Sequence, residues 1–434
     1  MNAGATGIFD HLDFTQTHQG RKLLRQRFER PPATSAELRD VQRAVRFLGA
    51  QTELRWQLDR GLADAVDSYL GSNFVTSTAR GFISLAIASW WYELRYPEIV
   101  QRLRSGVAAV QHLLCAIQEL VAMIAEARPP EGVLLHHVNR YAQELRHSGL
   151  DQLTTGSRAM SRVDSLAWDR RLRGELRGNL HRLLDSAFEL DALMAIAKAN
   201  QEYQLVLPEI IDDENPRIVI TGLRHLFVSK PHLNDCELGP SSSVVLLTGP
   251  NMAGKSTYIK ACALAVYLAH VGFGVPADGM RVSFFDRIAA SIATTDNVRQ
   301  GYSYFSSEVK RVSDITGWLL RGERTLVILD EPFKGTNVKD AADSTRLALE
   351  SFAACRSSLF LIASHLAEVA HDLQDVPGFR CGYFGAELQD GAPVYDYALR
   401  AGVSSQRLGL WVIETMGLLA QLRALRENGD PRGR

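Results

Sequence analysis

A glycine-bracketed loop followed by a lysine and a serine, GPNMAGKST, constrains this chain more than any other feature. It fits the pattern GxxxxGK[ST], with Gly249, Gly254, Lys255 and Ser256 at the required positions. Glycines let the backbone curl so that successive N–H groups converge on phosphate oxygens. The apolar run VVLL before the loop predicts a strand, and a helix is expected from about Lys255, whose N-terminal dipole favours an anion. This context is the one that a phosphate-binding loop requires.

The residues of this loop are expected to have separate roles. Lys255 supplies a positive charge to the β- and γ-phosphates, and Ser256 offers a hydroxyl to Mg²⁺. The alternative is a glycine turn that only joins a strand to a helix. The predicted nucleotide-contacting set is Gly249, Pro250, Asn251, Met252, Ala253, Gly254, Lys255, Ser256 and Thr257.

Two further apolar strands end in residues suited to the same chemistry. TLVILDEP places Asp330 and Glu331 at a strand end, where one carboxylate can hold Mg²⁺ and the next can orient and deprotonate the attacking water. SLFLIAS ends before His365, which is well placed to touch the γ-phosphate or that water. A solvated acidic turn and a surface histidine are the alternatives. Together with the loop, these residues predict Mg²⁺-dependent hydrolysis of a nucleoside triphosphate, with ATP the usual ligand.

The rest of the pattern divides the chain into two parts and a tail. Residues 1–205 read as almost entirely helical, because apolar residues recur at three- and four-residue spacing. From residue 206 to about 420, strands alternate with helices, which predicts a mostly parallel sheet flanked by helices. Residues 421–434 are expected to be disordered. The fold class is therefore an α/β P-loop NTPase domain preceded by an all-α domain.

The composition of the chain excludes few classes of function, but it favours a cytoplasmic location for the protein. The net charge is -1, so no global field marks a nucleic-acid binder. The five cysteines are scattered without a CxxC pair, which fits a reducing compartment and no zinc site. The N-terminus has no signal-peptide pattern. The most apolar segments, residues 82–91 and 107–125, are short or interrupted by polar residues, so they are expected to be buried helices without a membrane partner.

Several stretches resemble the MutS family of mismatch-repair ATPases in the same order along the chain. GPNMAGKSTYIK is similar to the family's P-loop, TTDNVRQGYSYFSSE to its signature segment, and DEPFKGTN to its Walker B motif and the following loop. FVSKPHLND, IASH and YALRAGVSSQRLG resemble further family segments, and the helical half matches more weakly. The resemblance covers residues 9–48 and 180–415.

The resemblance implies a dimeric mechanism. In this family each nucleotide is bound by one subunit and completed by the other, so Ser303 in the signature segment reaches the γ-phosphate held by the partner, and Phe227 stacks on adenine. Lys255, Glu331 and His365 act within their own subunit. Nucleotide state would thereby be coupled to helical arms, or levers, formed by the first half. On residue chemistry alone, the preferred interpretation of Ser303 is a polar loop residue and that of Phe227 is a core aromatic.

The chain also departs from the family. We expect no counterpart here of the family's N-terminal mismatch-binding domain, with its Phe-x-Glu wedge, or of its connector domain, and no complete DNA clamp. Pro332 and Lys334 follow Walker B, Tyr304 replaces a small hydroxyl residue and Ala253 replaces a glycine. These features indicate a short, divergent member. Mismatch recognition itself is unsupported, although the Arg-rich stretches GRKLLRQRFER and WDRRLRGELRGNLHR could contact phosphate or be solvated helix faces.

The leading hypothesis is a MutS-like homodimeric ATPase that acts on DNA in mismatch repair or recombination. The first alternative is an ATP-gated switch whose partner is a protein or a structured RNA. A transporter-type or chromosome-maintenance ATPase is disfavoured, because the sequence has no LSGGQ-like signature and no long heptad repeat. A catalytically dead protein is disfavoured by the intact Lys255, Asp330 and Glu331.

Overall fold

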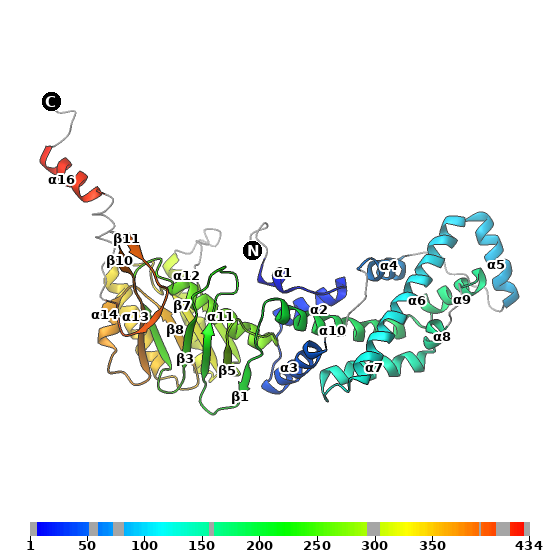
Figure 1. The fold of residues 1–434 in the computed structure, drawn as a ribbon, viewed down its shortest axis with the longest axis horizontal. Helices are drawn as coiled ribbons and strands as arrows, with labels where there is room; N and C mark the ends of the chain where they lie inside the picture. Colours follow the sequence, from blue (N-terminus) through cyan, green and yellow to red (C-terminus); the bar gives the residue numbers. More distant parts are fainter. Residues whose placement is uncertain are drawn as a thin grey trace. The chain divides into compact units, whose positions relative to one another are not determined.

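The computed structural model describes residues 7–51, 60–72, 82–155, 160–292, 304–389, 392–404 and 417–428. The chain separates into two compact units (Figure 1). The helical unit comprises Met1–Gln204 and Val271–Phe273, and the α/β unit comprises Leu205–His270 and Gly274–Arg434.

The helical unit contains no strand among its described residues. Its helices are α1 (Ile8–Leu12), α2 (His18–Glu29), α3 (Ser35–Ala50), α4 (Arg60–Gly71), α5 (Phe82–Arg95), α6 (Pro97–Glu126), α7 (Val133–Ser148), α8 (Asp151–Thr154), α9 (Arg162–Arg173) and α10 (Arg177–Glu202). Side-chain caps start several of them: the Thr17 hydroxyl accepts a hydrogen bond from Gly20 N at 2.9 Å at the start of α2. Helix α10 is buried on most sides and packs against α2, α3 and α7.

Buried polar groups connect distant segments of the helical unit. Asp191 in α10 accepts hydrogen bonds from Gln16 N at 3.0 Å, from Thr17 N at 2.9 Å and from the Thr17 hydroxyl at 2.6 Å. These bonds fix the N-terminal segment on α10. Desolvation of the buried carboxyl raises the pKa of Asp191 to about 6, although the donated hydrogen bonds oppose that shift.

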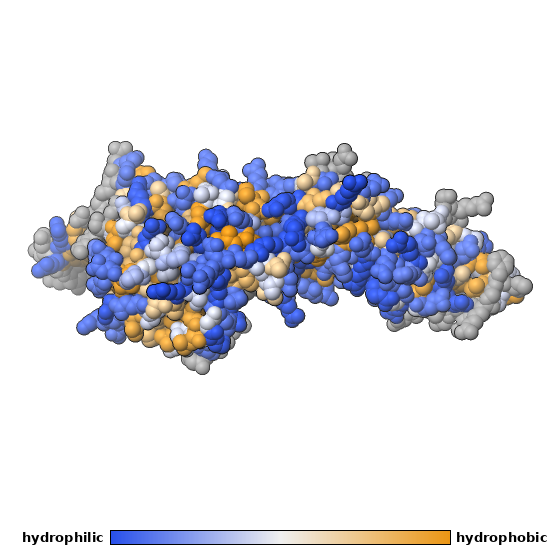
Figure 2. Space-filling model, turned by 90° about the horizontal axis from the view of Figure 1, so that it is seen from below, coloured by the Kyte–Doolittle hydropathy of each residue, from blue (hydrophilic) through white to orange (hydrophobic). Residues whose placement is uncertain are grey.

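Helix α6 is the one described helix that is long and apolar enough, by length and composition, to cross a membrane. Its buried residues recur at three- and four-residue spacing from Leu103 to Ile124. This face packs against α4, α7, α8 and α9, as in the core helix of a helical domain. Hydrophilic residues cover much of the face of the protein that Figure 2 shows, with hydrophobic patches between them.

The main sheet of the α/β unit has six strands in the order β12-β9-β4-β8-β7-β6. Their bounds are β4 (Val244–Thr248), β6 (Arg287–Ser291), β7 (Thr325–Asp330), β8 (Leu359–Ala363), β9 (Phe379–Phe384) and β12 (Leu399–Ala401). All neighbours pair in parallel except β12, which is antiparallel to β9. Strands β4, β7 and β8 lie where the sequence predicts them, and β4 and β8 are buried throughout.

Helices α11 (Lys255–Val271), α12 (Tyr304–Leu320), α13 (Val338–Ala353) and α14 (Ala367–Asp372) follow or precede these strands in the chain. Helix α12 contacts β7 and α13 contacts β4 (Figure 1). The core between sheet and helices includes the stacked rings of Phe352 and Phe360, whose centroids are 4.5 Å apart. Alternation of strand and helix therefore produces the expected parallel sheet flanked by helices.

Three parts of the α/β unit differ from the sequence expectation or add to it. A second sheet, in the order β1-β5-β2-β3, mixes parallel and antiparallel pairs. Its strands are β1 (Glu209–Ile211), β2 (Ile218–Leu223), β3 (Asn234–Leu238) and β5 (Gly279–Ser283), and a hairpin joins β10 (Glu387–Gln389) to β11 (Ala392–Val394). Helix α16 (Leu418–Asn428) occupies part of the segment 421–434 that was expected to be disordered. Its sequence, LLAQLRALREN, is rich in strong helix formers.

Candidate functional site

The loop between β4 and α11 needs its glycines for backbone geometry. Gly249 has a φ of 131°, and a Cβ at this position would lie 2.3 Å from the carbonyl oxygen of Phe384. Gly254 has a φ of 111° and lies close to the ring of Tyr397. Both residues therefore adopt backbone conformations that side chains rarely allow. The loop follows the carboxyl end of β4 and leads directly into the first turn of α11.

Lys255 begins α11 and is 5% exposed. Its Nζ donates hydrogen bonds to the carbonyl oxygens of Gly249 at 2.6 Å and Pro250 at 3.0 Å. Burial lowers the pKa of Lys255, whereas the carboxylates of Glu331 and Asp330 oppose that shift. The ammonium group thus lies inside the loop and within electrostatic reach of both acidic residues.

The strand register brings the predicted site residues to one edge of the sheet. Leu247 of β4 and Asp330 of β7 are both aligned with Ala363 of β8. The residues that follow these positions are the glycine loop, Glu331 and His365, so the three segments leave the sheet side by side. Ligands of α/β proteins commonly bind beside the carboxyl ends of parallel strands.

Glu331 is held by partners on both sides of its carboxylate. His365 Nε2 contacts its Oε1, and Lys334 Nζ lies 2.6 Å from its Oε2. The bond with His365 lowers the pKa of Glu331 to about 2; burial opposes this shift and Lys334 assists it. The backbone N–H of Glu331 also donates to the carbonyl of Ala363 at 2.8 Å, which ties the end of β7 to β8.

A cavity of about 550 Å³ lies over the loop, between the main sheet and the segment after β2. From the predicted set it is lined by Pro250, Asn251, Met252, Gly254, Lys255, Ser256, Thr257 and Glu331. Gly249 accepts a hydrogen bond from Lys255, and Ala253 is buried within the loop. Asp330 precedes Glu331 in the chain, and His365 contacts the Glu331 carboxylate. The structure therefore brings the predicted loop and strand-end residues together.

Two predicted residues are not shown at the site in their predicted roles. Phe227 is 41% exposed, and its ring lies at the edge of the His225 ring, with the centroids 6.3 Å apart. Its neighbours His225 and Val228 line the cavity, so the adenine-stacking role of Phe227 stays a prediction. Ser303 lies outside the described residues.

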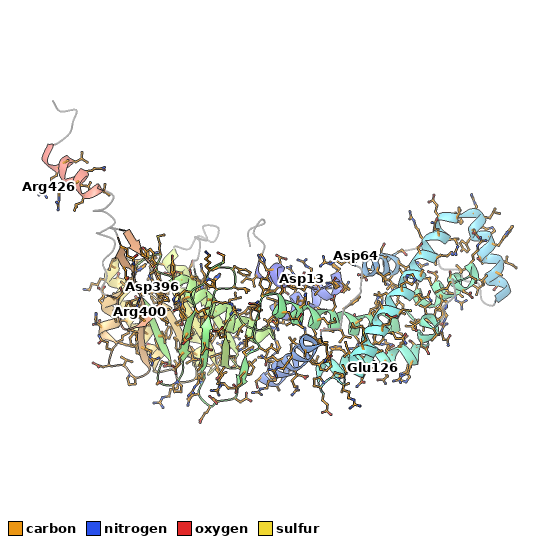
Figure 3. All side chains as sticks on the ribbon, viewed as in Figure 1. Asp13, Asp64, Glu126, Asp396, Arg400 and Arg426 are labelled. Atoms are coloured by element: carbon orange, nitrogen blue, oxygen red, sulfur yellow. The ribbon has the colours of Figure 1, made fainter. Side chains whose placement is uncertain are left out.

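Sequence reasoning missed residues that shape the far wall of the cavity. Tyr397 lines it with a φ of 57°, and its carbonyl accepts a hydrogen bond from Asn234 Nδ2 at 3.0 Å. Asn234 Oδ1 in turn accepts from Leu399 N at 2.8 Å. Asp396 and Arg400, both labelled in Figure 3, form an ion pair that connects the residues before and after Tyr397. The sequence shows the asparagine in FVSKPHLND and the tyrosine in YALRAG, but the two residues are far apart in the chain.

A magnesium ion fits the donor set at the end of β7. Asp330 Oδ1 is buried and has no hydrogen-bond partner among the described residues, which is costly unless a ligand satisfies it. Ser256 lines the adjoining cavity and carries a hydroxyl. No group of three or more His, Cys, Asp or Glu side chains forms a metal cage in the described part of the chain. Magnesium usually takes one or two protein oxygens and completes its shell with water and substrate phosphates, so the pair is sufficient.

Comparison with known families identifies the second half of the chain. Residues 245–425 match the family MutS domain V. This part of the chain is similar to MutS domain V. The matched region begins in β4 and includes the glycine loop, the strand ends of β7 and β8 and the Tyr397 segment, so every described catalytic candidate lies inside this domain. The resemblance predicted from the sequence is thereby confirmed.

Relatives found with the whole sequence agree with this match. The chain is 32% identical over 236 residues to the "DNA mismatch repair protein MutS" of Anaplasma phagocytophilum (strain HZ), covering 54% of this chain and 28% of that protein. It is 30% identical over 270 residues to the protein of the same name from Natronomonas pharaonis, covering 60% and 31%. A MutS of Roseiflexus sp. (strain RS-1) is 32% identical over 240 residues, covering 53% and 22%. The chain thus spans less than a third of the length of these relatives.

Proposed function

We propose that the MutS domain V of this chain is a P-loop ATPase that binds ATP with Mg²⁺ and hydrolyses it. One observation carries this proposal: Lys255 after β4 and the Asp330–Glu331 pair at the end of β7 lie at the same edge of the sheet, on the two strands that flank β8, beside a cavity of about 550 Å³. A buried cation, an unsatisfied buried carboxylate oxygen and a second carboxylate are the groups that phosphoryl transfer to water requires.

Each residue has a role that follows from its position. Lys255 leaves the carbonyls of its own loop to bind the β- and γ-phosphates, which offer a stronger, charged acceptor. Ser256 and Asp330 would hold Mg²⁺, which neutralises the charge that develops on the phosphate oxygens. Glu331 orients the attacking water and accepts its proton, and His365 fixes the orientation of that carboxylate.

The nucleotide base is expected at the wall formed by His225, Val228 and Tyr397. Phe227 would join this wall if the segment before β3 closed over adenine. Met252 is 82% exposed with a φ of 66°, so the tip of the loop faces the open side of the cavity, where a ligand enters.

The active form is proposed to be a homodimer that acts on DNA. The relatives are named for DNA mismatch repair, and residues 245–425 of this chain match MutS domain V. Ser303 of one subunit would complete the nucleotide site of the other, and the nucleotide state would move the helical units. DNA phosphates are expected to bind to arginines of the helical unit. The proposed DNA is a duplex or branched intermediate of repair or recombination rather than a mismatch alone. The five cysteines are all free, which fits the reducing cytoplasm.

The deciding experiment measures binding and turnover of Mg–ATP by the full chain. Lys255→Met removes the charge but keeps the length, and we expect it to weaken ATP binding tenfold to a hundredfold, as for the loss of a charged hydrogen bond. Lys339→Met, on the exposed first turn of α13, is the matched control. Equal turnover in wild type and Lys255→Met would refute the proposal.

The DNA and dimer proposals need separate measurements. Mass in solution is determined with and without ATP, and then with duplex, mismatched and branched DNA. Retention of DNA that weakens steeply with salt supports phosphate contacts. No retention at low salt, even with ATP, would instead favour a protein or structured RNA as the partner.

A further inference from the structure

A second lysine lies at the candidate catalytic carboxylate, and the ATPase chemistry described above does not use it. Lys334 Nζ lies 2.6 Å from Glu331 Oε2, across a turn of three residues. The side chain of Lys334 is 64% exposed, whereas that of Glu331 is 19% exposed. Because His365 contacts the other oxygen, both oxygens of Glu331 have a cationic or hydrogen-bonding partner from this chain.

The turn that carries Lys334 has an unusual backbone. Glu331 has a φ of 52° and Phe333 a φ of 63°, and neither residue is a glycine. Such conformations are costly for residues with a side chain and persist only where the surroundings hold them. Phe333 is buried and its ring lies 6.5 Å from that of Phe305, so packing holds one end of the turn. The ion pair of Lys334 with Glu331 spans the same turn.

The two contacts of Glu331 differ in character. His365 follows β8, whose register with β7 is fixed by the sheet, so this contact belongs to the rigid edge. Lys334 reaches Glu331 from an exposed position on a flexible stem. An attacking water must approach the carboxylate from the cavity and occupy a position beside one of its two oxygens. Lys334 is the partner that can leave without disturbing the strand ends.

We propose that Lys334 competes with the attacking water for Glu331 Oε2, so that the Lys334–Glu331 ion pair must open before the carboxylate can act. Lys334 is then a positioning residue that limits turnover and does not touch the nucleotide. This inference rests on the proposed ATPase function. It also predicts a gain of activity on removal of the lysine, whereas a lysine that bound phosphate would give a loss.

The kinetic test compares Lys334→Met, which keeps the stem without the charge, with Lys334→Arg, which keeps the charge. Exposed ion pairs contribute little, so we expect kcat of Lys334→Met to rise two- to fivefold while KM and ATP affinity stay within twofold of wild type. Lys334→Arg should stay within twofold in kcat. A lower or unchanged kcat in Lys334→Met would overturn the inference. Thermal unfolding of each variant checks that the fold is intact.

A second measurement does not depend on turnover. Acylation of lysine by an amine-reactive ester, followed by peptide mass spectrometry, reports whether each amine is engaged. In the wild type, Lys334 should react at least twofold more slowly than the exposed Lys339. In Glu331→Gln, Lys334 should react faster than in the wild type, because the ion pair is gone. Equal rates in the wild type, or the same protection in Glu331→Gln, would show that the ion pair does not form and would refute the inference.

The outcomes separate this inference from the function on which it rests. Turnover in the wild type with unchanged kcat in Lys334→Met removes only the role of Lys334. Absence of ATP binding and turnover in the wild type and in both Lys334 variants removes the proposed function, and the competition with water along with it.

Discussion

Glu331 at the end of β7 and His365 after β8 meet through their side chains, at the edge of the sheet where the glycine loop also emerges. The contact joins two residues that are far apart in the chain but adjacent in strand register. The hydrogen bond with the imidazole lowers the pKa of Glu331 to about 2. A carboxylate that stays ionised and is oriented by a neighbour suits the positioning of a water molecule.

Replacement of Glu331 by glutamine should separate binding from hydrolysis. The amide has the same shape but cannot accept the proton of the water, so we expect turnover to fall a hundredfold or more while ATP still binds. Binding is measured with a non-hydrolysable analogue and turnover by phosphate release. Glu368→Gln, on the exposed face of α14, is the control and should behave as wild type. Undiminished turnover in Glu331→Gln would remove this residue from the water-activating role.

The position of Tyr397 in the cavity wall predicts a second, independent effect, on the binding of ATP. Its ring lines the cavity near Gly254, and Asn234 holds its backbone, so Tyr397→Ala should weaken ATP binding about tenfold through loss of contact with the base. Inorganic triphosphate, which lacks the base, should bind wild type and variant equally well. Tyr96→Ala, at an exposed tyrosine of the helical unit that does not line the cavity, is the control. Equal loss of affinity for ATP and triphosphate would show that the variant has damaged the loop instead.

Local patterns allowed prediction of the parts of the site that depend on neighbours in sequence. The glycine loop, the buried strands before it and the acidic ends of β7 follow from apolar runs and from backbone geometry that only glycine adopts easily. The contacts of Glu331 with Lys334 and His365 were not predicted as contacts, because the first depends on a strained turn and the second on strand register. The Asn234–Tyr397 bond joins residues 163 positions apart, which no periodicity reveals.

The same limits apply to larger elements. The second sheet is built from short strands, such as the three residues of β1, whose pairing depends on chain segments far away in sequence. Conversely, the long helices of the first unit repeat their apolar residues over many turns, and the sequence indicates them plainly. Predicted helices were therefore reliable in the described part of the helical unit, while sheet order required the structure.

Shared sites between subunits can be tested by mixing variants. If Ser303 acts on the nucleotide of its partner, Ser303→Ala should lose hydrolysis, and Lys255→Ala should lose it as well. In a mixed dimer, one site combines an intact Lys255 from the first subunit with an intact Ser303 from the second. Mixing equal amounts should therefore recover up to about a quarter of wild-type activity, because half of the dimers are mixed and each has one complete site. Ser307→Ala serves as a control. No recovery at any ratio would contradict the assignment across the interface.

The buried carboxyl of Asp191 predicts how stability depends on pH. Its pKa is raised from 3.8 to about 6 in the folded chain, so the folded state binds more protons than the unfolded state between these values. The free energy of unfolding should therefore fall as pH rises from about 4 to about 6 and then level off. The full contribution to the free energy of unfolding is about 3 kcal/mol, at 1.36 kcal/mol for each pKa unit.

Asp191→Asn keeps an oxygen acceptor for the N–H groups of Gln16 and Thr17 and does not titrate, so its stability should lack this dependence on pH. Denaturant unfolding of both proteins from pH 4 to pH 8, with the exposed Asp185→Asn as control, measures the difference directly. Parallel curves for wild type and Asp191→Asn would mean that the carboxyl is already ionised at pH 4 in the folded chain, and that its hydrogen bonds outweigh its burial.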